Sequence, residues 1–164
     1  MAALFFSAWH LSYQMLAFGC EPNPAAKGRD TVLTREAYDR YVRAFNAKDY
    51  DAVADFYVDP PLMTFFGVEI RSRQALKDFY EFLHHHVTES VTVLNFACSD
   101  TLTAIDAVIR VEGVNDLTRE ALDARGLHGF FPIAVGEVQE MRQFIFYTIK
   151  DGLIERVECA LAQA

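Results

Sequence analysis

Residues 40–51, RYVRAFNAKDYD, carry the clearest local pattern of the chain, the second half of an amphipathic helix followed by a stop. Thr34 suits the N-cap of this helix because its hydroxyl can accept a hydrogen bond from the first turn, and we expect the helix to end near Lys48. Its apolar residues recur at intervals of three and four, at Tyr38, Tyr41, Val42 and Phe45. The pattern therefore predicts one stripe buried against a core.

Two further helices are expected on the C-terminal side of this segment. Asp51 is the predicted cap of a short helix over residues 52–57, which Asp59-Pro60-Pro61 ends. Residues 62–70, around Gly67, are prone to β-structure and predict a short hairpin. Ser72 caps a third helix, whose expected buried stripe consists of Ala75, Leu76, Phe79, Tyr80 and Leu83.

From residue 88 onward the apolar period changes to two, which indicates β-strands. Residues 115–137 form an insert with a short helical stretch, and Lys150-Asp151-Gly152 is a turn with a glycine available for positive φ. Helices followed by a run of antiparallel strands predict an α+β fold with helices on one face of a curved sheet. The expected strands span residues 91–96, 102–111, 137–149 and 153–161.

The composition fits one globular domain. Of the 164 residues 52% are apolar, and a chain of this length buries enough surface to fold without disulfides or metals. The 15 basic and 23 acidic residues give a net charge of −8, which disfavours nucleic-acid binding because that depends on neutralising phosphates. Cys20, Cys98 and Cys159 lack the spacing of a zinc site. We therefore expect reduced thiols, no metal and a cytoplasmic location.

Residues 1–30 are expected to stand apart from the domain, which we place at residues 31–164. The run from Leu4 to Gly19 is mostly apolar, but no basic segment precedes it, so that an export signal is the weaker alternative. The run also falls short of the roughly 20 predominantly apolar residues that a membrane span needs. We expect an apolar helical extension that packs on the domain or on a partner subunit, followed by a linker.

The element order and three short motifs resemble the nuclear-transport-factor-2-like superfamily, especially its SnoaL-like polyketide cyclases and ketosteroid isomerases. The motifs are residues 40–51, the segment from Gly67 through Arg71-Ser72 to Phe79-Tyr80, and residues 150–154. The resemblance implies a cone-shaped fold, the cystatin-like α+β barrel, in which a curved antiparallel sheet wraps around about three N-terminal helices and encloses one apolar pocket. It also implies chemistry without a metal or organic cofactor, and a homodimer paired through the outer sheet face.

Three tyrosines match the ketosteroid isomerase pattern. Tyr41 falls where that family keeps its oxyanion-donor tyrosine, and Tyr57 and Tyr80 fall where some members keep supporting tyrosines in a hydrogen-bonded chain. The general-base aspartate of the family would lie near Thr64 or Phe65, and its second oxyanion donor near Ile145. None of these three side chains is a carboxylic acid. The chain therefore has the tyrosine donor of the family but lacks its general base.

Histidine is the expected substitute for this base, because its unperturbed pKa lies nearest 7. His84, His85 and His86 end the third helix, where successive residues point about 100° apart, so at most two can face the pocket. We expect His86 to be the base, with His84 as second choice. The alternative is that these side chains only offset the helix dipole. Three consecutive histidines do not match the usual i, i+4 metal spacing.

The long strand predicts the remainder of the pocket wall. Met141, Gln143, Ile145 and Tyr147 share its inner face. The other expected substrate-binding positions are Phe65, Cys159, Tyr57 and Tyr80, although Cys159 can also be an inert buried thiol. The outer face holds Glu140, Arg142, Phe144 and Phe146, which suggests a partner surface. Within the insert, Phe130-Phe131-Pro132 is either a lid over the pocket or a simple excursion.

The leading hypothesis is therefore a cofactor-independent acid/base enzyme, either an isomerase, an aldol-type cyclase or a retro-aldol C–C lyase. It would act on a small hydrophobic, aromatic or polycyclic substrate through an enolate-like intermediate, which Tyr41 would stabilise as a hydrogen-bond donor. The alternative is a non-catalytic small-molecule-binding or assembly module of the same fold. Epoxide hydrolysis, which in the superfamily needs an Asp-Arg-Asp relay, is disfavoured because Asp106 and Arg110 fall on the expected outer face.

Overall fold

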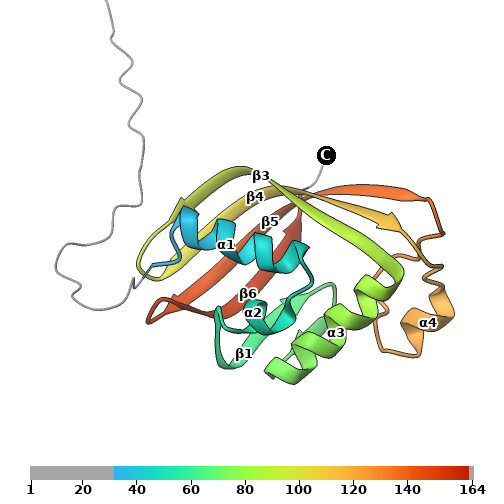
Figure 1. The fold of residues 1–164 in the computed structure, drawn as a ribbon, viewed down its shortest axis with the longest axis horizontal. Coiled ribbons are helices and arrows are strands. Elements are labelled where there is room, and N and C mark those ends of the chain that lie inside the picture. Colours follow the sequence, from blue (N-terminus) through green and yellow to red (C-terminus); the bar gives the residue numbers. More distant parts are fainter. Residues whose placement is uncertain (1–31, 163–164) are drawn as a thin grey trace, which may run out of the picture.

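A six-stranded curved sheet dominates the computed structural model, which describes residues 32–162 (Figure 1). The strands lie side by side in the order β2-β1-β6-β5-β4-β3, so the sheet stays open. The predicted α+β class is confirmed, with one correction: β1 and β6 pair in parallel, whereas the other neighbours are antiparallel. The strands are β1 (Tyr57–Phe65), β2 (Val68–Ile70), β3 (Val87–Cys98), β4 (Leu102–Gly113), β5 (Val138–Lys150) and β6 (Leu153–Leu161).

Two of the three predicted caps are confirmed. Thr34 and Ser72 each accept a hydrogen bond from the backbone amide three residues further on, and Thr118 caps the helix of the insert in the same way. The exception is the second helix, which Asp49 caps instead of Asp51. The helices are α1 (Arg35–Asn46), α2 (Tyr50–Ala54), α3 (Arg73–His86) and α4 (Arg119–Asp123).

The segment after α2 also differs from the prediction. Tyr57, expected to end a helix, is the first residue of β1, and β1 continues through Asp59-Pro60-Pro61. The register between β1 and β6 shifts between Tyr57 and Leu62. Prolines lack an amide hydrogen and are tolerated where a strand ladder is interrupted, which explains why this pair lies within a strand here and does not stop a helix.

The helices α1, α2 and α3 lie along one face of the sheet (Figure 1), and the core forms between these layers. On β4 the alternation holds as predicted, since Ile105, Ala107 and Ile109 are buried. β3 begins at Val87 directly after α3, four residues earlier than expected. On α3 itself Leu76, Phe79 and Tyr80 are buried, but Ala75 is exposed and His84 takes the last buried place of the stripe.

The insert between β4 and β5 is an ordered substructure. Leu117 and Ile133 form a bridge that closes it, and both are buried together with Leu122 and Leu127. Gly129 packs so tightly on the β1–β2 hairpin that a Cβ atom there would lie 2.0 Å from the carbonyl oxygen of Phe66. The insert is therefore packed tightly against the β1–β2 hairpin, at one end of the sheet.

Three further predictions concern the N-terminal extension, the cysteines and a membrane span, and the structure tests them only in part. The predicted extension over residues 1–30 lies outside the described residues. Cys98 is disulfide-bonded, so the expectation of reduced thiols is wrong for this residue, because disulfide pairing cannot be deduced from sequence alone. Cys159 is a free thiol as expected. Among the helices of the described part, none is both long and apolar enough to cross a membrane.

Candidate functional site

A cavity of about 140 Å³ lies between the helices, the sheet and the insert. An apolar cavity of about 150 Å³ holds one benzene molecule, so this one has room for roughly a single six-membered ring. One end is closed by three rings that meet edge to face, with centroid separations of 5.3 Å (Phe65–Phe79), 5.8 Å (Phe65–Phe130) and 5.7 Å (Phe79–Phe130). Phe131 also lines the cavity. The insert therefore forms part of the cavity wall.

Most of the residues that the sequence assigned to the pocket line this cavity. Among these predicted residues, four come from the inner face of β5, as its alternation predicts, and α1, α3, β1 and β6 provide one each. Asp106 and Arg110 do not line it; Asp106 instead accepts hydrogen bonds from Arg142 and Asn95. The predicted residues found in the wall are Tyr41, Phe65, Tyr80, Met141, Gln143, Ile145, Tyr147 and Cys159.

Tyr57 is the predicted binding residue that does not reach the cavity. It is fully buried behind Tyr41, and the two hydroxyl oxygens are 3.0 Å apart. The hydroxyl of Tyr80 contacts the sulfur of Met63 at 3.8 Å, so the expected chain of three hydroxyls reduces to one pair. Such a weak acceptor leaves Tyr80 free to donate to a guest.

Burial controls the protonation of these phenols. Removal from water raises the pKa values of Tyr41, Tyr57, Tyr80 and Tyr147 well above the ordinary value for tyrosine. Burial also raises the pKa of the Cys159 thiol to about 12. At neutral pH these groups are therefore uncharged hydrogen-bond donors, and none of them is a base.

His86, the preferred base of the sequence analysis, is not at the cavity. Its ring packs against Phe82 with centroids 5.1 Å apart, and its Nδ1 is buried without a hydrogen bond among the described residues. Two residues along a helix correspond to a rotation of about 200°, so His84 and His86 cannot share a face. His84 is the inward one, but it stands behind the cavity wall and does not line it.

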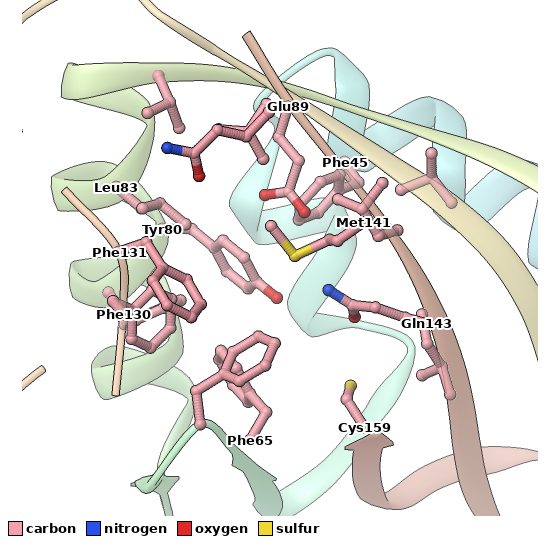
Figure 2. Close-up of a pocket in the computed structure, with 18 of the residues that line it drawn as sticks. Phe45, Phe65, Tyr80, Leu83, Glu89, Phe130, Phe131, Met141, Gln143 and Cys159 are labelled. Atoms are coloured by element: carbon pink, nitrogen blue, oxygen red, sulfur yellow. The ribbon is translucent and has the colours of Figure 1, made fainter. Parts of the chain in front are cut away.

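Glu89 on β3 is the carboxylate that the sequence analysis missed. It lines the cavity, and its side chain is 16% exposed. Figure 2 shows its carboxylate, the Tyr80 hydroxyl and the Gln143 amide pointing into the same space, near the Met141 sulfur. The negative charge of Glu89 contributes to the raised pKa values of Tyr80 and Cys159. A carboxylate thus faces uncharged donors across an apolar space.

A sequence signal for Glu89 does exist. Val87, Glu89, Val91 and Val93 alternate with polar residues and share the inner face of β3. The predicted strand spans residues 91–96 and therefore leaves Glu89 outside it. Extending the period-two pattern back to the end of α3 would have brought the carboxylate into the apolar face.

The cavity wall holds no basic residue within the described part of the chain. An anionic guest would therefore meet the Glu89 carboxylate without any compensating cation, which disfavours its binding. No three acidic, histidine or cysteine side chains gather to form a metal site among residues 32–162. Gln143 is 7% exposed, and its amide has no hydrogen-bond partner in the same range, so it is available to a guest.

Comparisons with solved structures give the same fold at low sequence identity. A candidate polyketide cyclase from Silicibacter sp. TM1040 superposes with a TM-score of 0.63 and 20% identity over 77% of this chain and 87% of its own. An LEH-like epoxide hydrolase of M. tuberculosis gives a TM-score of 0.57 and 12% identity over 77% and 80% of the two chains.

A third structure, from Catenulispora acidiphila, has a ketosteroid isomerase-like fold and was solved in complex with trimethylamine. It gives a TM-score of 0.59 and 10% identity over 77% of this chain and 85% of that one. No curated protein matches the sequence. The model of the SnoaL-like domain family matches residues 38–157, which run from within α1 into β6 and hold every residue of the cavity wall except Cys159. The chain therefore belongs to the SnoaL-like domain family.

Proposed function

We propose that this protein is a cofactor-independent acid/base enzyme that forms an enolate from a small carbonyl compound. Glu89 is the proposed base: a carboxylate oxygen takes a proton from the carbon beside the carbonyl group, and the electron pair of that C–H bond moves into the enolate. The Tyr80 hydroxyl and the Gln143 amide donate to the enolate oxygen. The observation that carries the proposal is the Glu89 carboxylate in an otherwise apolar cavity lined by neutral donors.

Tyr41 keeps its proposed donor role, with Tyr57 behind it. Either hydroxyl of this pair can be the donor. When Tyr57 donates to the Tyr41 oxygen, the Tyr41 hydrogen is free for the guest, and the pair shares the negative charge that develops on it. Tyr57 would then support the site without contacting the substrate.

The fate of the enolate defines the reaction class. In an isomerase the proton on Glu89 returns to a different carbon of the same molecule. In an aldol-type cyclase the enolate carbon attacks a second carbonyl group, whose oxygen takes up the proton, and a retro-aldol lyase runs this step backwards. The family and its cyclase- and isomerase-like neighbours support this group of reactions for the chain.

The size and charge of the cavity narrow the proposed substrate. A volume of about 140 Å³ suits one ring and its carbonyl group, so we replace the broader expectation of a polycyclic substrate with a single-ring compound. The absence of a basic residue among the described wall residues favours an uncharged compound over a carboxylate or phosphate ester.

A second candidate function is non-catalytic capture of a small amine. Aromatic rings around a carboxylate are a suitable environment for an ammonium group, through cation–π attraction and charge pairing. A cavity with Glu89 among the rings of Phe45, Tyr80 and Phe65 has this composition, and a structural neighbour was solved with trimethylamine. Calorimetric titration with cyclohexanone, benzoate and benzylamine separates the two functions, because capture requires benzylamine to bind far more tightly than the neutral ketone.

We further propose that the outer sheet face pairs two copies of the chain. Phe144 and Phe146 on β5 are 38% and 42% exposed, although aromatic residues of this size are normally more buried. They lie on the face of β5 opposite the cavity, beside Ala160 and Glu158 of β6. Burial of these rings against a second copy would leave the cavity of each subunit intact.

Exchange of α-protons in D2O, followed by NMR, tests the proposed function with cyclohexanone and cyclohex-2-enone as probes. The wild-type protein should accelerate the exchange, and Glu89→Gln should lower the catalysed rate by about 10²-fold or more, as expected for loss of a general base. Glu140→Gln, on the opposite face of the sheet, is the matched control and should retain the rate. Equal rates in the wild type and in Glu89→Gln would refute the proposal.

A further inference from the structure

Glu89 has a buried polar partner on its far side, His84 of α3. The imidazole Nε2 is 3.4 Å from Oε2 of Glu89, and Nδ1 is 2.8 Å from the hydroxyl oxygen of Tyr50. The imidazole side chain is 3% exposed, and its ring meets Phe45 edge to face with centroids 5.1 Å apart. A histidine so deeply buried and held at both nitrogens has one orientation available.

The surroundings of His84 decide which nitrogen carries a hydrogen. If the imidazole is neutral, Tyr50 donates to Nδ1, and Nε2–H donates to the Glu89 carboxylate. If it is protonated, Nδ1–H donates to Tyr50, whose hydroxyl can turn to the backbone carbonyl of Tyr80, 3.4 Å away. In both states Nε2 carries a hydrogen and directs it at Oε2. The remaining neutral tautomer would point the Nε2 lone pair at a carboxylate and is disfavoured.

We infer that His84, fixed by Tyr50, is a positioning residue that holds one oxygen of Glu89 and leaves the other directed at the guest. This inference rests on the proposed role of Glu89 as the base. A carboxylate on a long side chain has several rotamers, and in a cavity large enough for a ring it can turn away from the reacting carbon. The hydrogen bond from His84 removes this freedom, which is the contribution that pre-organisation makes to a proton transfer.

A spectroscopic measurement tests the geometry independently of any reaction. In protein labelled with 15N-histidine, two-bond 1H–15N correlation spectra show which ring nitrogen of His84 is protonated, with His84→Gln providing the assignment. We expect a hydrogen on Nε2 in the wild type and a mixture of tautomers in Tyr50→Phe, which lacks the partner of Nδ1. A neutral Nδ1–H tautomer in the wild type would overturn the inference, whatever the activity of the protein.

A kinetic measurement tests the consequence. His84→Leu should lower the rate of ketone α-proton exchange by about 10²-fold, since a misplacement of about 1 Å can cost that much. His84→Gln should restore part of the rate, because its amide N–H can replace Nε2–H. His85→Gln, one residue along α3 and exposed, is the matched control and should keep the rate. Tyr50→Phe serves as the milder variant if His84→Leu does not fold.

The two proposals fail in different ways. If the wild-type protein exchanges no ketone proton but the spectrum shows Nε2–H, the proposed reaction is wrong and the contact between His84 and Glu89 stands. If the wild type is active and Glu89→Gln is inactive, but His84→Leu and Tyr50→Phe fold and retain the full rate, Glu89 is the base and the positioning role of His84 is refuted.

Discussion

For single residues, burial determines the chemistry of this site more than residue type does. Four tyrosines and Cys159 can ionise in principle, but removal from water raises each pKa and keeps the groups neutral. The only acidic side chain in the described cavity wall is Glu89. One residue therefore supplies the negative charge, and the neighbouring hydroxyls and amide supply donors.

A contrasting carboxylate lies on the outer face. Arg142 and Asn95 donate hydrogen bonds to Asp106 and lower its pKa from 3.8 to about 2. Since the folded-state pKa lies below the ordinary value, this pairing stabilises the fold above about pH 4 and is lost as the pH falls towards 2. Asp106→Asn should therefore melt at a lower temperature at pH 7, and the difference from the wild type should shrink at pH 2. A constant difference across this range would contradict the assignment.

Among the helices and strands, regular periodicity was predictable and irregular junctions were not. The stripe of α1, the part of the α3 stripe formed by Leu76, Phe79 and Tyr80, the caps Thr34 and Ser72, and the inner face of β5 follow from spacing alone and are found as expected. The prediction for the junction from α2 to β1 was wrong because prolines normally end a helix. Here they lie within a strand, where its register with β6 shifts. Glu89 was missed because β3 starts without a loop after α3.

The contact between the insert and the β1–β2 hairpin gives a prediction for Gly129. An alanine Cβ at this position would lie 2.0 Å from the Phe66 carbonyl oxygen, so the backbone must move apart. We expect Gly129→Ala to destabilise the fold by about 1–3 kcal/mol, the usual cost of overpacking. It should also weaken the binding of a single-ring ketone, because Phe130 moves with this segment. Thermal unfolding and calorimetric titration measure the two effects, and unchanged binding would show that the insert does not form the lid.

Taken as a whole, the molecule owes its cavity to the open curvature of the sheet. α1 and α3 lie on the same face (Figure 1), and the space between them is closed by an insert far away in sequence. No local sequence pattern encodes this space. Its volume, and the way side chains of β3 and β5 face it together, follow only from the three-dimensional fold. The resemblance to a known superfamily predicted that a pocket exists, but neither its size nor its carboxylate.

The exposed aromatic face of the sheet makes the state of assembly testable. Phe146→Glu places a charge beside Glu158 on β6 and should convert the proposed homodimer to a monomer. Size-exclusion chromatography with light scattering measures the mass of both proteins. A monomeric wild type, or a dimer that survives this substitution, would contradict pairing through this face.

The central claim is that a neutral ring compound lies between the Glu89 carboxylate and the donors of the opposite wall. A crystal structure of the protein soaked with cyclohex-2-enone tests it most directly. The account predicts the ring inside the cavity, the carbonyl oxygen within hydrogen-bond distance of Tyr80, Tyr41 or Gln143, and a carbon beside the carbonyl facing Glu89. A ligand bound elsewhere, or a carbonyl group turned away from every one of these donors, would contradict it.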